Sequence, residues 1–233
     1  MLALLHTSPV HVPVFDALRD RDHPGLELRH FVDEDLLARA RDRGPDAVAA
    51  EVGAVLARAV AEGARAVLCT CSTLGAVAEA VAESAGVRVP VLRVDRPMAA
   101  AAVAAGPRVV VLAALESTLG PTAELVAEEA ARAGRPVRVR TLLVDDAWDR
   151  FEAGDTEGYV RLVAATADTV TGADADAVVL AQASMAPAQH LATTPVPVLS
   201  SPAPGLAAAA EAAGRHRPRA AGTRPDAPRA TTG

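Results

Sequence analysis

Short apolar runs alternate with longer alanine-rich stretches along nearly the whole chain, and this alternation constrains the fold more than any other feature. The runs are rich in Val and Leu and span residues 2–6, 26–32, 65–70, 89–94, 108–114, 137–144, 176–182 and 196–200. The stretches with helical periodicity span residues 45–62, 75–85, 97–105, 120–133, 157–171 and 202–213. Apolar strands that alternate with helices are typical of a parallel sheet covered on both faces. The sequence therefore predicts an α/β protein with a doubly wound parallel sheet.

One part of the chain is repeated. Residues 65–81, RAVLCTCSTLGAVAEAV, parallel residues 176–192, DAVVLAQASMAPAQHLA, and VPVL follows each of them, at 89–92 and 196–199. The alignment sets Cys71 opposite Gln182 and Thr73 opposite Ser184, and the same offset brings residues 6–8 near 117–119. The repeat predicts two lobes related by pseudo-twofold symmetry, the first from residues 1–95 plus 200–213 and the second from 96–199. Since ligands of open α/β sheets bind beyond the carboxyl ends of the strands, both lobes can face one cleft.

Composition argues against several classes of partner. The net charge is −6 and no basic face is evident before the tail, whereas nucleic-acid binding needs clustered cations. The chain has no run of about 18 apolar residues free of charges, and its first residues lack the basic region of a signal peptide. We therefore expect a cytoplasmic protein with neither a nucleic-acid nor a membrane partner. Residues 214–233, rich in Arg, Pro, Gly and Thr, are predicted to be a disordered tail, the alternative being a weak polyanion-binding arm.

The two cysteines of the chain lie two residues apart, where a predicted strand ends. Cys69 is expected to pack in the core, because an extended CxC segment suits a disulfide poorly and no further metal ligands lie at close spacing. Cys71 stands just before a predicted helix, whose N-terminal N–H groups favour an anion, so its thiol can lose a proton near neutral pH. Such a thiol acts as a general base or a nucleophile; the alternative is a small buried apolar side chain.

Hydroxyl residues cluster after four of the predicted strands, as HTS at 6–8, CST at 71–73, EST at 116–118 and QAS at 182–184. Each Ser or Thr can simply cap a helix, but four clusters that meet in one cleft form a set of donors suited to a carboxylate. The candidate substrate-binding residues are His6, Thr7, Ser8, Ser72, Thr73, Ser117, Thr118, Ala183 and Ser184. The sequence has no glycine-rich phosphate loop. We expect a small carboxylate as the ligand, with no nucleotide and no metal.

In their order along the chain, these motifs resemble the aspartate/glutamate/hydantoin racemase superfamily. The motifs are VLCTCSTLG, VPVLRVDRPM, VVVLAALESTLGPT, VVLAQASMA and VPVLSSP, and the match extends over roughly residues 1–213. The resemblance implies two flavodoxin-like lobes with the active site between them, and no metal, pyridoxal phosphate or other cofactor. Related proteins are often dimers or larger, which implies a possible homo-oligomer.

The resemblance also implies roles for particular residues. Members typically place one cysteine in each lobe, on opposite faces of a bound carboxylate substrate, and the two exchange a proton at the carbon next to the carboxylate. Cys71 matches the first cysteine, with Ser72 and Thr73 beside it as substrate-binding neighbours. Other carboxylate-binding hydroxyls match Thr7, Ser117 and Thr118.

The second cysteine of that pattern is missing, because both the resemblance and the internal repeat place Gln182 there. An amide donates hydrogen bonds but exchanges no protons at useful rates. We therefore expect a racemase or epimerase with one catalytic thiol, Cys71, facing Gln182, in which another residue such as His6 serves the second face. The alternatives are a decarboxylase of a malonate-like acid, a cis–trans isomerase of an unsaturated diacid, and a protein that binds a carboxylate without catalysis. Arg96 is a candidate partner for a second carboxylate of the substrate, against a role as a surface charge.

Overall fold

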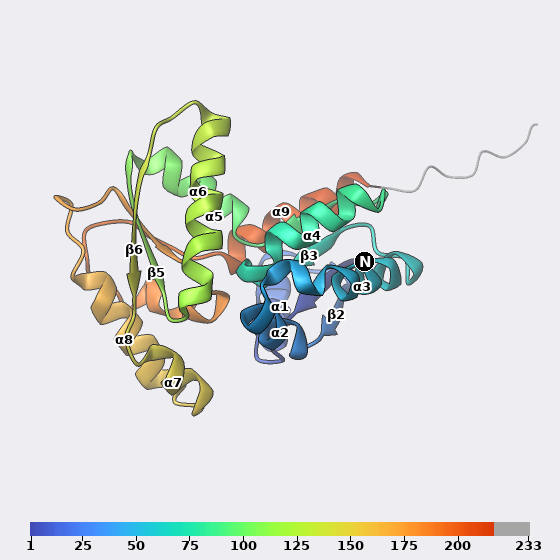
Figure 1. Cartoon of the computed structure of the whole chain (residues 1–233), viewed down its shortest axis with the longest axis horizontal. Coiled ribbons are helices and arrows are strands. Elements are labelled where there is room, and N and C mark those ends of the chain that lie inside the picture. The colour runs from blue at the N-terminus through green and yellow to red at the C-terminus, as the bar shows by residue number, and fades with distance from the viewer. Residues whose placement is uncertain (217–233) are drawn as a thin grey trace, which may run out of the picture.

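Two parallel four-stranded sheets, each covered by helices on both faces, form two lobes that lie side by side in the computed structural model (Figure 1). The structure describes residues 1–216, so most of the predicted tail at 214–233 lies outside the described residues. The strand order is β2-β1-β3-β4 in the first lobe and β6-β5-β7-β8 in the second. The predicted fold class, two doubly wound α/β lobes, is confirmed.

The first lobe is built from the N-terminal part of the chain and one C-terminal helix. Its strands are β1 (Leu2–His6), β2 (Leu28–Val32), β3 (Val67–Cys69) and β4 (Val91–Arg93). Its helices are α1 (His11–Asp22), α2 (Asp35–Arg43), the 3₁₀ helix η1 (Pro45–Val48), α3 (Ala49–Ala61), α4 (Ser72–Ser84) and α9 (Pro202–Arg215). Helix α9 returns to pack against α1, β1 and β3. Gly205 lets α9 lie close to the residue after β4, because a Cβ there would lie 2.4 Å from the carbonyl oxygen of Val94.

The second lobe repeats the strand order with different helices. Its strands are β5 (Arg108–Ala113), β6 (Arg138–Leu143), β7 (Ala177–Leu180) and β8 (Val198–Leu199). Its helices are α5 (Arg96–Ala105), the 3₁₀ helix η2 (Glu116–Thr118), α6 (Leu119–Ala133), α7 (Ala147–Glu152), α8 (Thr156–Asp168) and the 3₁₀ helix η3 (Ala183–His190). In Figure 1 α5 and α6 lie on one side of β5 and β6, and α7 and α8 lie on the other.

Alternate residues of the central strands feed two separate cores in each lobe, as expected for side chains that point to opposite faces of a sheet. In the first lobe Leu2 and Leu4 of β1 face Phe15 of α1, and all three are inaccessible to solvent. The intervening residues Ala3 and Leu5 join the core formed with α2, α3 and α4. Burial on both faces explains why these strands appear in the sequence as unbroken apolar runs.

Helices α1, α2 and α7 are absent from the predicted set. Each buries few residues: Phe15 in α1, Leu36 and Ala40 in α2, and Ala147 in α7. With one buried residue each, α1 and α7 give little apolar periodicity, which is the main signal for a helix. The segment after β7 is the 3₁₀ helix η3 with Pro187 inside it, although the repeat aligns it with α4.

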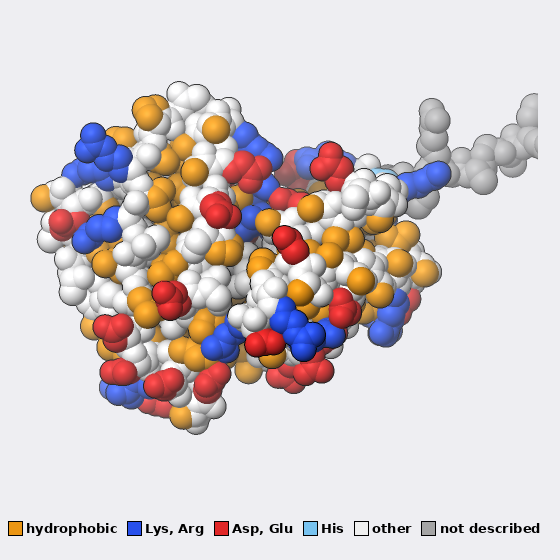
Figure 2. Space-filling model, viewed as in Figure 1, with side chains coloured by type: hydrophobic (Ala, Val, Ile, Leu, Met, Phe, Trp, Pro, Cys, Tyr) orange, Lys and Arg blue, Asp and Glu red, His pale blue; other side chains and the backbone are white. Residues whose placement is uncertain are grey.

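Charged side chains of both signs are interspersed over the face shown in Figure 2. None of the helices described is long and apolar enough to cross a membrane.

Candidate active site

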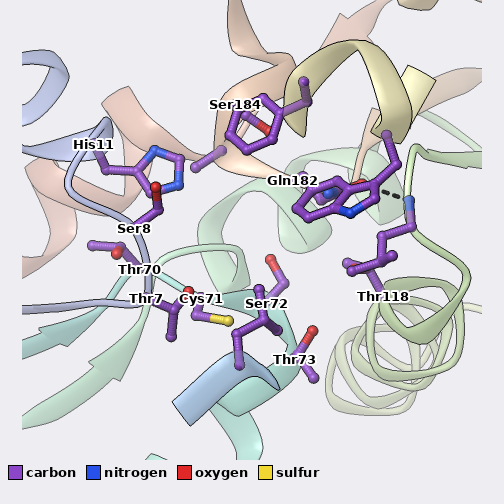
Figure 3. Close-up of a pocket in the computed structure, with 15 residues that line it drawn as sticks. Thr7, Ser8, His11, Thr70, Cys71, Ser72, Thr73, Thr118, Gln182 and Ser184 are labelled. Carbon is purple, nitrogen blue, oxygen red and sulfur yellow. Dashed lines mark hydrogen bonds between the residues drawn. The ribbon is translucent and has the colours of Figure 1, made fainter. Parts of the chain in front are cut away.

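The carboxyl ends of the central strands of both sheets meet at one cavity of about 50 Å³ between the lobes (Figure 3). The loops after β1, β3 and β7 and the segment after β5 supply most of its wall. The lining residues are Thr7, Ser8, His11, Leu37, Thr70, Cys71, Ser72, Thr73, Leu115, Thr118, Trp148, Phe151, Gln182, Ala183 and Ser184. Of the residues predicted for the site, the structure brings together all except His6, Ser117 and the candidate Arg96.

Cys71 immediately precedes helix α4, and its backbone is extended, with φ −100° and ψ 115°. Burial raises the pKa of its thiol, while the Thr7 hydroxyl and the backbone N–H groups of Leu74 and Thr73 pull the pKa down. The net shift is upward. The structure therefore differs from the expected acidic thiol: the helix N-terminus is in place, but burial of the sulfur away from water outweighs it.

Cys69 belongs to the core. Its side chain is inaccessible to solvent, and its S–H group donates to the carbonyl of Cys71 with a distance of 3.6 Å. Burial, reinforced by the neighbouring Cys71, raises its pKa well above the usual range. Cys69 therefore stays protonated, and it does not line the cavity.

Gln182 occupies the position of Cys71 in the second lobe, directly before η3. Its side-chain oxygen accepts hydrogen bonds from the backbone N–H groups of Ala114 at 2.7 Å and Leu115 at 3.1 Å. Because these donors hold the amide oxygen, the amide nitrogen and its two hydrogens are left for other acceptors. Gln182 is thus a fixed hydrogen-bond donor at the cavity.

The register of the sheets decides which residues of the two lobes are equivalent. Leu5 of β1 pairs with Cys69 of β3, and Leu112 of β5 pairs with Leu180 of β7. Since Cys69 and Leu180 are equivalent in the repeat, Leu5 and Leu112 are equivalent too. The sequence alignment applied the spacing between the two third strands to the two first strands as well. The sheet register shows that the spacing between the first strands is shorter.

The corrected register makes Ala114, and not Thr118, the counterpart of Thr7. The Thr7 hydroxyl contacts the Cys71 thiol, and the backbone N–H of Ala114 donates to Gln182, so equivalent positions of the two lobes make these contacts through different groups. Ser117 falls inside η2 and does not line the cavity; its hydroxyl is buried without a partner among the described residues. The prediction that Ser117 contacts the substrate is corrected accordingly.

The hydroxyls of Ser72 and Ser184 in the cavity already have hydrogen-bond partners in the protein. Ser72 donates to the carbonyl of Ala181 across the two lobes at 2.8 Å. Ser184 shares a 2.8 Å hydrogen bond with the hydroxyl of Tyr159. Ser72 therefore ties the lobes together directly beside Cys71 and Gln182.

His6 lies behind the cavity and does not line it. The Thr70 hydroxyl donates to the Leu5 carbonyl at 3.0 Å, so it accepts from Nδ1 of His6 at 2.8 Å. Nε2 of His6 then accepts from Nδ1 of His30, also at 2.8 Å. Burial, with the nearby imidazoles of His30 and His11, lowers the pKa of His6 to about 3. Both ring nitrogens are engaged and the ring is closed off from solvent, so the expectation that His6 serves the second face is corrected.

The imidazole that does line the cavity is His11, at the first position of α1. Burial lowers its pKa to about 4, so the ring is neutral near pH 7. His11 is not among the residues predicted for the site. The available signal was its position: the first turn of a helix that follows a central strand faces the carboxyl edge of the sheet.

Trp148 and Phe151 were also missed, because α7 was not predicted. Their rings stack with centroids 5.0 Å apart, and both line the cavity. Arg96, the candidate partner for a second carboxylate, lies elsewhere. It binds Glu79 of α4 and Glu129 of α6, and so joins the two lobes outside the cavity.

The cavity is lined by neutral groups only. Among the residues that the structure describes, no Asp, Glu, Lys or Arg lines it, and no group of three potential metal ligands occurs. It combines one thiol, one neutral imidazole, one fixed amide and several hydroxyls, an arrangement suited to proton transfer on a ligand bound through neutral donors.

Comparisons with known proteins agree with this geometry. The sequence model of the Asp/Glu/Hydantoin racemase family matches residues 13–230. No curated protein sequence matches the chain.

Solved structures of similar fold include three enzymes. The Picrophilus torridus aspartate racemase is 14% identical with a TM-score of 0.67, over 91% of this chain and 94% of that one. A glutamate racemase isoform from Bacillus anthracis is 17% identical with a TM-score of 0.63, over 89% and 79%. A Nocardia farcinica maleate cis–trans isomerase is 19% identical with a TM-score of 0.59, over 91% of each chain. That structure is of a cysteine-to-serine mutant with a covalently bound succinylcysteine intermediate.

Proposed function

The chain belongs to the Asp/Glu/Hydantoin racemase family, and from that premise we propose that it is a cofactor-independent racemase or epimerase acting at the carbon next to a carboxylate. The observation that carries the proposal is the placement of Cys71 at the start of α4, in a cavity that it shares with His11 and Gln182. In Figure 3 His11 and Gln182 lie in the upper part of the view, above Cys71 and Thr73. One thiol and one imidazole supply the two proton carriers that inversion requires.

The resting protonation state supports a specific direction of proton flow. Burial keeps the Cys71 thiol protonated by raising its pKa, and burial keeps His11 neutral by lowering its pKa to about 4. From this state His11 removes the proton at the α-carbon, and the Cys71 thiol returns one on the opposite face. The product state, an imidazolium and a thiolate, carries out the reverse reaction on the other enantiomer. Atoms and charges balance without any cofactor.

The negative charge that develops on the carboxylate needs donors that are already in position. We assign this role to the Gln182 amide N–H groups, whose orientation is fixed by Ala114 and Leu115. The hydroxyls of Ser8 and Thr118 and the N-terminal N–H groups of α4 add neutral donors around the same cavity. Gln182 thus stabilises the intermediate in place of a second thiol.

Cis–trans isomerisation of an unsaturated acid is the second candidate. It is favoured by the similarity in fold to the maleate isomerase, which holds a succinylcysteine when one of its cysteines is replaced by serine. In this reaction the Cys71 sulfur adds to the double bond, the new single bond rotates, and the sulfur leaves again. A single thiol is sufficient for such addition and elimination.

Proton exchange in deuterated water tests the proposal. Enantiopure α-substituted carboxylic acids are incubated with the protein, and loss of the α-proton signal is followed by NMR together with optical rotation. We expect deuterium incorporation with inversion, and a rate of inversion about a thousandfold lower in Cys71→Ala, because a positioned acid or base contributes about that factor.

Cys69→Ala is the matched control, since it removes a buried thiol that does not line the cavity and should leave exchange in place. Inversion that survives at the wild-type rate in Cys71→Ala contradicts the mechanism, whereas exchange with retention on the His11 face agrees with it. Conversion of a cis to a trans acid, with a covalent adduct on Cys71 seen by mass spectrometry, supports the second candidate instead. Release of CO₂ from a malonate-like acid identifies a decarboxylase.

A further inference from the structure

A second and much larger cavity adjoins the candidate active site. Its volume is about 780 Å³, whereas the cavity at Cys71 measures about 50 Å³. The two cavities share His11, Phe151, Ala183 and Ser184 as lining residues. A ligand whose carboxylate lies beside Cys71 therefore has adjoining space for a substituent many times larger than the carboxylate itself.

The wall of the larger cavity is mainly apolar and comes from both lobes. Helix α1 and the residue before it contribute Val10 and Val14, α5 contributes Met98 and Ala101, and the start of α9 contributes Pro202. Val10 is 49% exposed and Val14 is 40% exposed. Two valines that line a concave surface and remain open to water gain from an apolar occupant.

Among the described residues, neither cavity offers a buried charged partner for a second carboxylate of the ligand. Within residues 1–216 the small cavity has no charged lining residue. The larger cavity has Arg21, but this side chain is 66% exposed and paired with Asp22 at 2.7 Å. A dicarboxylate would therefore bring its second charge next to apolar walls without a buried counter-ion, which is unfavourable.

We propose that the substrate is a monocarboxylate whose α-carbon bears a large apolar substituent, and that this substituent occupies the 780 Å³ cavity. The inference rests on the proposed function, because it takes the carboxylate to lie beside Cys71. Burial of a phenyl-sized group improves affinity by roughly ten- to a hundredfold. The occupant is a part of the substrate, because the cavity adjoins the catalytic one through four shared residues.

Binding to Cys71→Ala tests this substrate class without turnover. Acetate, succinate and phenylacetate are titrated by calorimetry or ligand-observed NMR. We expect phenylacetate to bind at least tenfold tighter than acetate, and succinate to bind no tighter than acetate. Tighter binding of succinate than of phenylacetate overturns the inference. The variant can also prefer phenylacetate while the wild-type protein shows no proton exchange with any acid. That result overturns the proposed function but supports the class of ligand.

A cavity-filling variant locates the apolar group. Ala101→Trp places an indole in the larger cavity, and Ala165→Trp places one at an exposed position of α8 that lines neither cavity. Ala101→Trp should weaken phenylacetate about tenfold without changing acetate, and Ala165→Trp should change neither. Equal effects of the two substitutions contradict the assignment. A change of oligomeric state in Ala101→Trp alone also contradicts it, and assigns the apolar surface to a second copy of the chain.

Discussion

The two lobes have the same strand order but end their third strands differently. β3 leads through Cys71 into α4, a regular helix of 13 residues. β7 leads through Gln182 into η3, a 3₁₀ helix of 8 residues with Pro187 inside it. Aligned peptide dipoles favour an anion before a regular helix, and a short 3₁₀ segment offers much less. The first lobe is therefore built to stabilise a thiolate when one forms, and the second lobe is built to hold a neutral amide.

Below these ends the lobes also differ in their buried polar groups. In the first lobe, Arg93 of β4 and Asp95 form a bidentate ion pair with 3% and 0% of their side chains exposed. Arg93 also donates to the carbonyl of Ser72 at 3.4 Å, and Gly75 leaves room for it, because a Cβ there would lie 2.8 Å from Arg93. The start of α4 thus rests on a buried charge pair. The ion pair of Arg108 with Asp176 in the second lobe lies near the surface, at 40% and 23% exposure.

Breaking the two ion pairs in turn should give the largest difference in stability between the two lobes. Asp95→Asn leaves the Arg93 guanidinium buried without its counter-charge, and we expect the free energy of unfolding to fall by roughly 3–5 kcal/mol. Asp176→Asn should cost much less, because solvent screens that pair. Urea unfolding of both variants measures the difference.

The double variant Arg93→Met with Asp95→Leu serves as the control, because it removes both charges together and should regain much of the stability lost in Asp95→Asn. Similar losses in Asp95→Asn and Asp176→Asn would mean that the first lobe does not depend on its buried pair.

Acid should weaken the first lobe through His6. Its pKa is about 3 in the folded protein and 6.5 in the unfolded chain, so the unfolded chain binds a proton that the folded lobe excludes. This contribution to stability is complete above pH 6.5 and is lost as the pH falls toward 3. At pH 5 the loss amounts to about 2 kcal/mol for this group. Urea unfolding at pH 8 and pH 5 should show that loss, and His6→Gln should reduce the difference between the two values.

Tyr159→Phe is the control in the second lobe. It removes the hydrogen bond to Ser184, but burial raises the pKa of Tyr159 to about 12, so this group is uncharged at both values of pH. Its stability should fall equally at pH 8 and pH 5. A pH difference that is unchanged in His6→Gln contradicts the assignment of acid sensitivity to His6.

The sequence could predict features that depend on local residues, but not those that depend on how distant segments pack. The strands were predictable because each is a local apolar run buried on both faces, and the equivalence of Cys71 with Gln182 follows from a continuous repeat. The position of Ser117 was not predictable, because the offset between the halves changes from one strand to the next and only the sheet register reveals it. The raised pKa of Cys71 was not predictable either, since burial depends on both lobes while the helix N-terminus is visible locally. His11 and the α7 aromatics were missed because α1 and α7 bury too few residues to show a periodicity.

The smallest expected effect concerns the contact that joins the two strand ends. Ser72→Ala removes the hydrogen bond to the Ala181 carbonyl across the lobes, and Ser184→Ala removes one to Tyr159 inside the second lobe. Each should lower the free energy of unfolding by about 1 kcal/mol, the usual value for a neutral hydrogen bond. Only Ser72→Ala frees the lobes to separate beside Cys71, so only this variant should speed alkylation of Cys71 by iodoacetamide, with Cys69→Ala as the common background. Equal alkylation rates in the two variants would show that the Ser72 contact adds stability without holding the cavity closed.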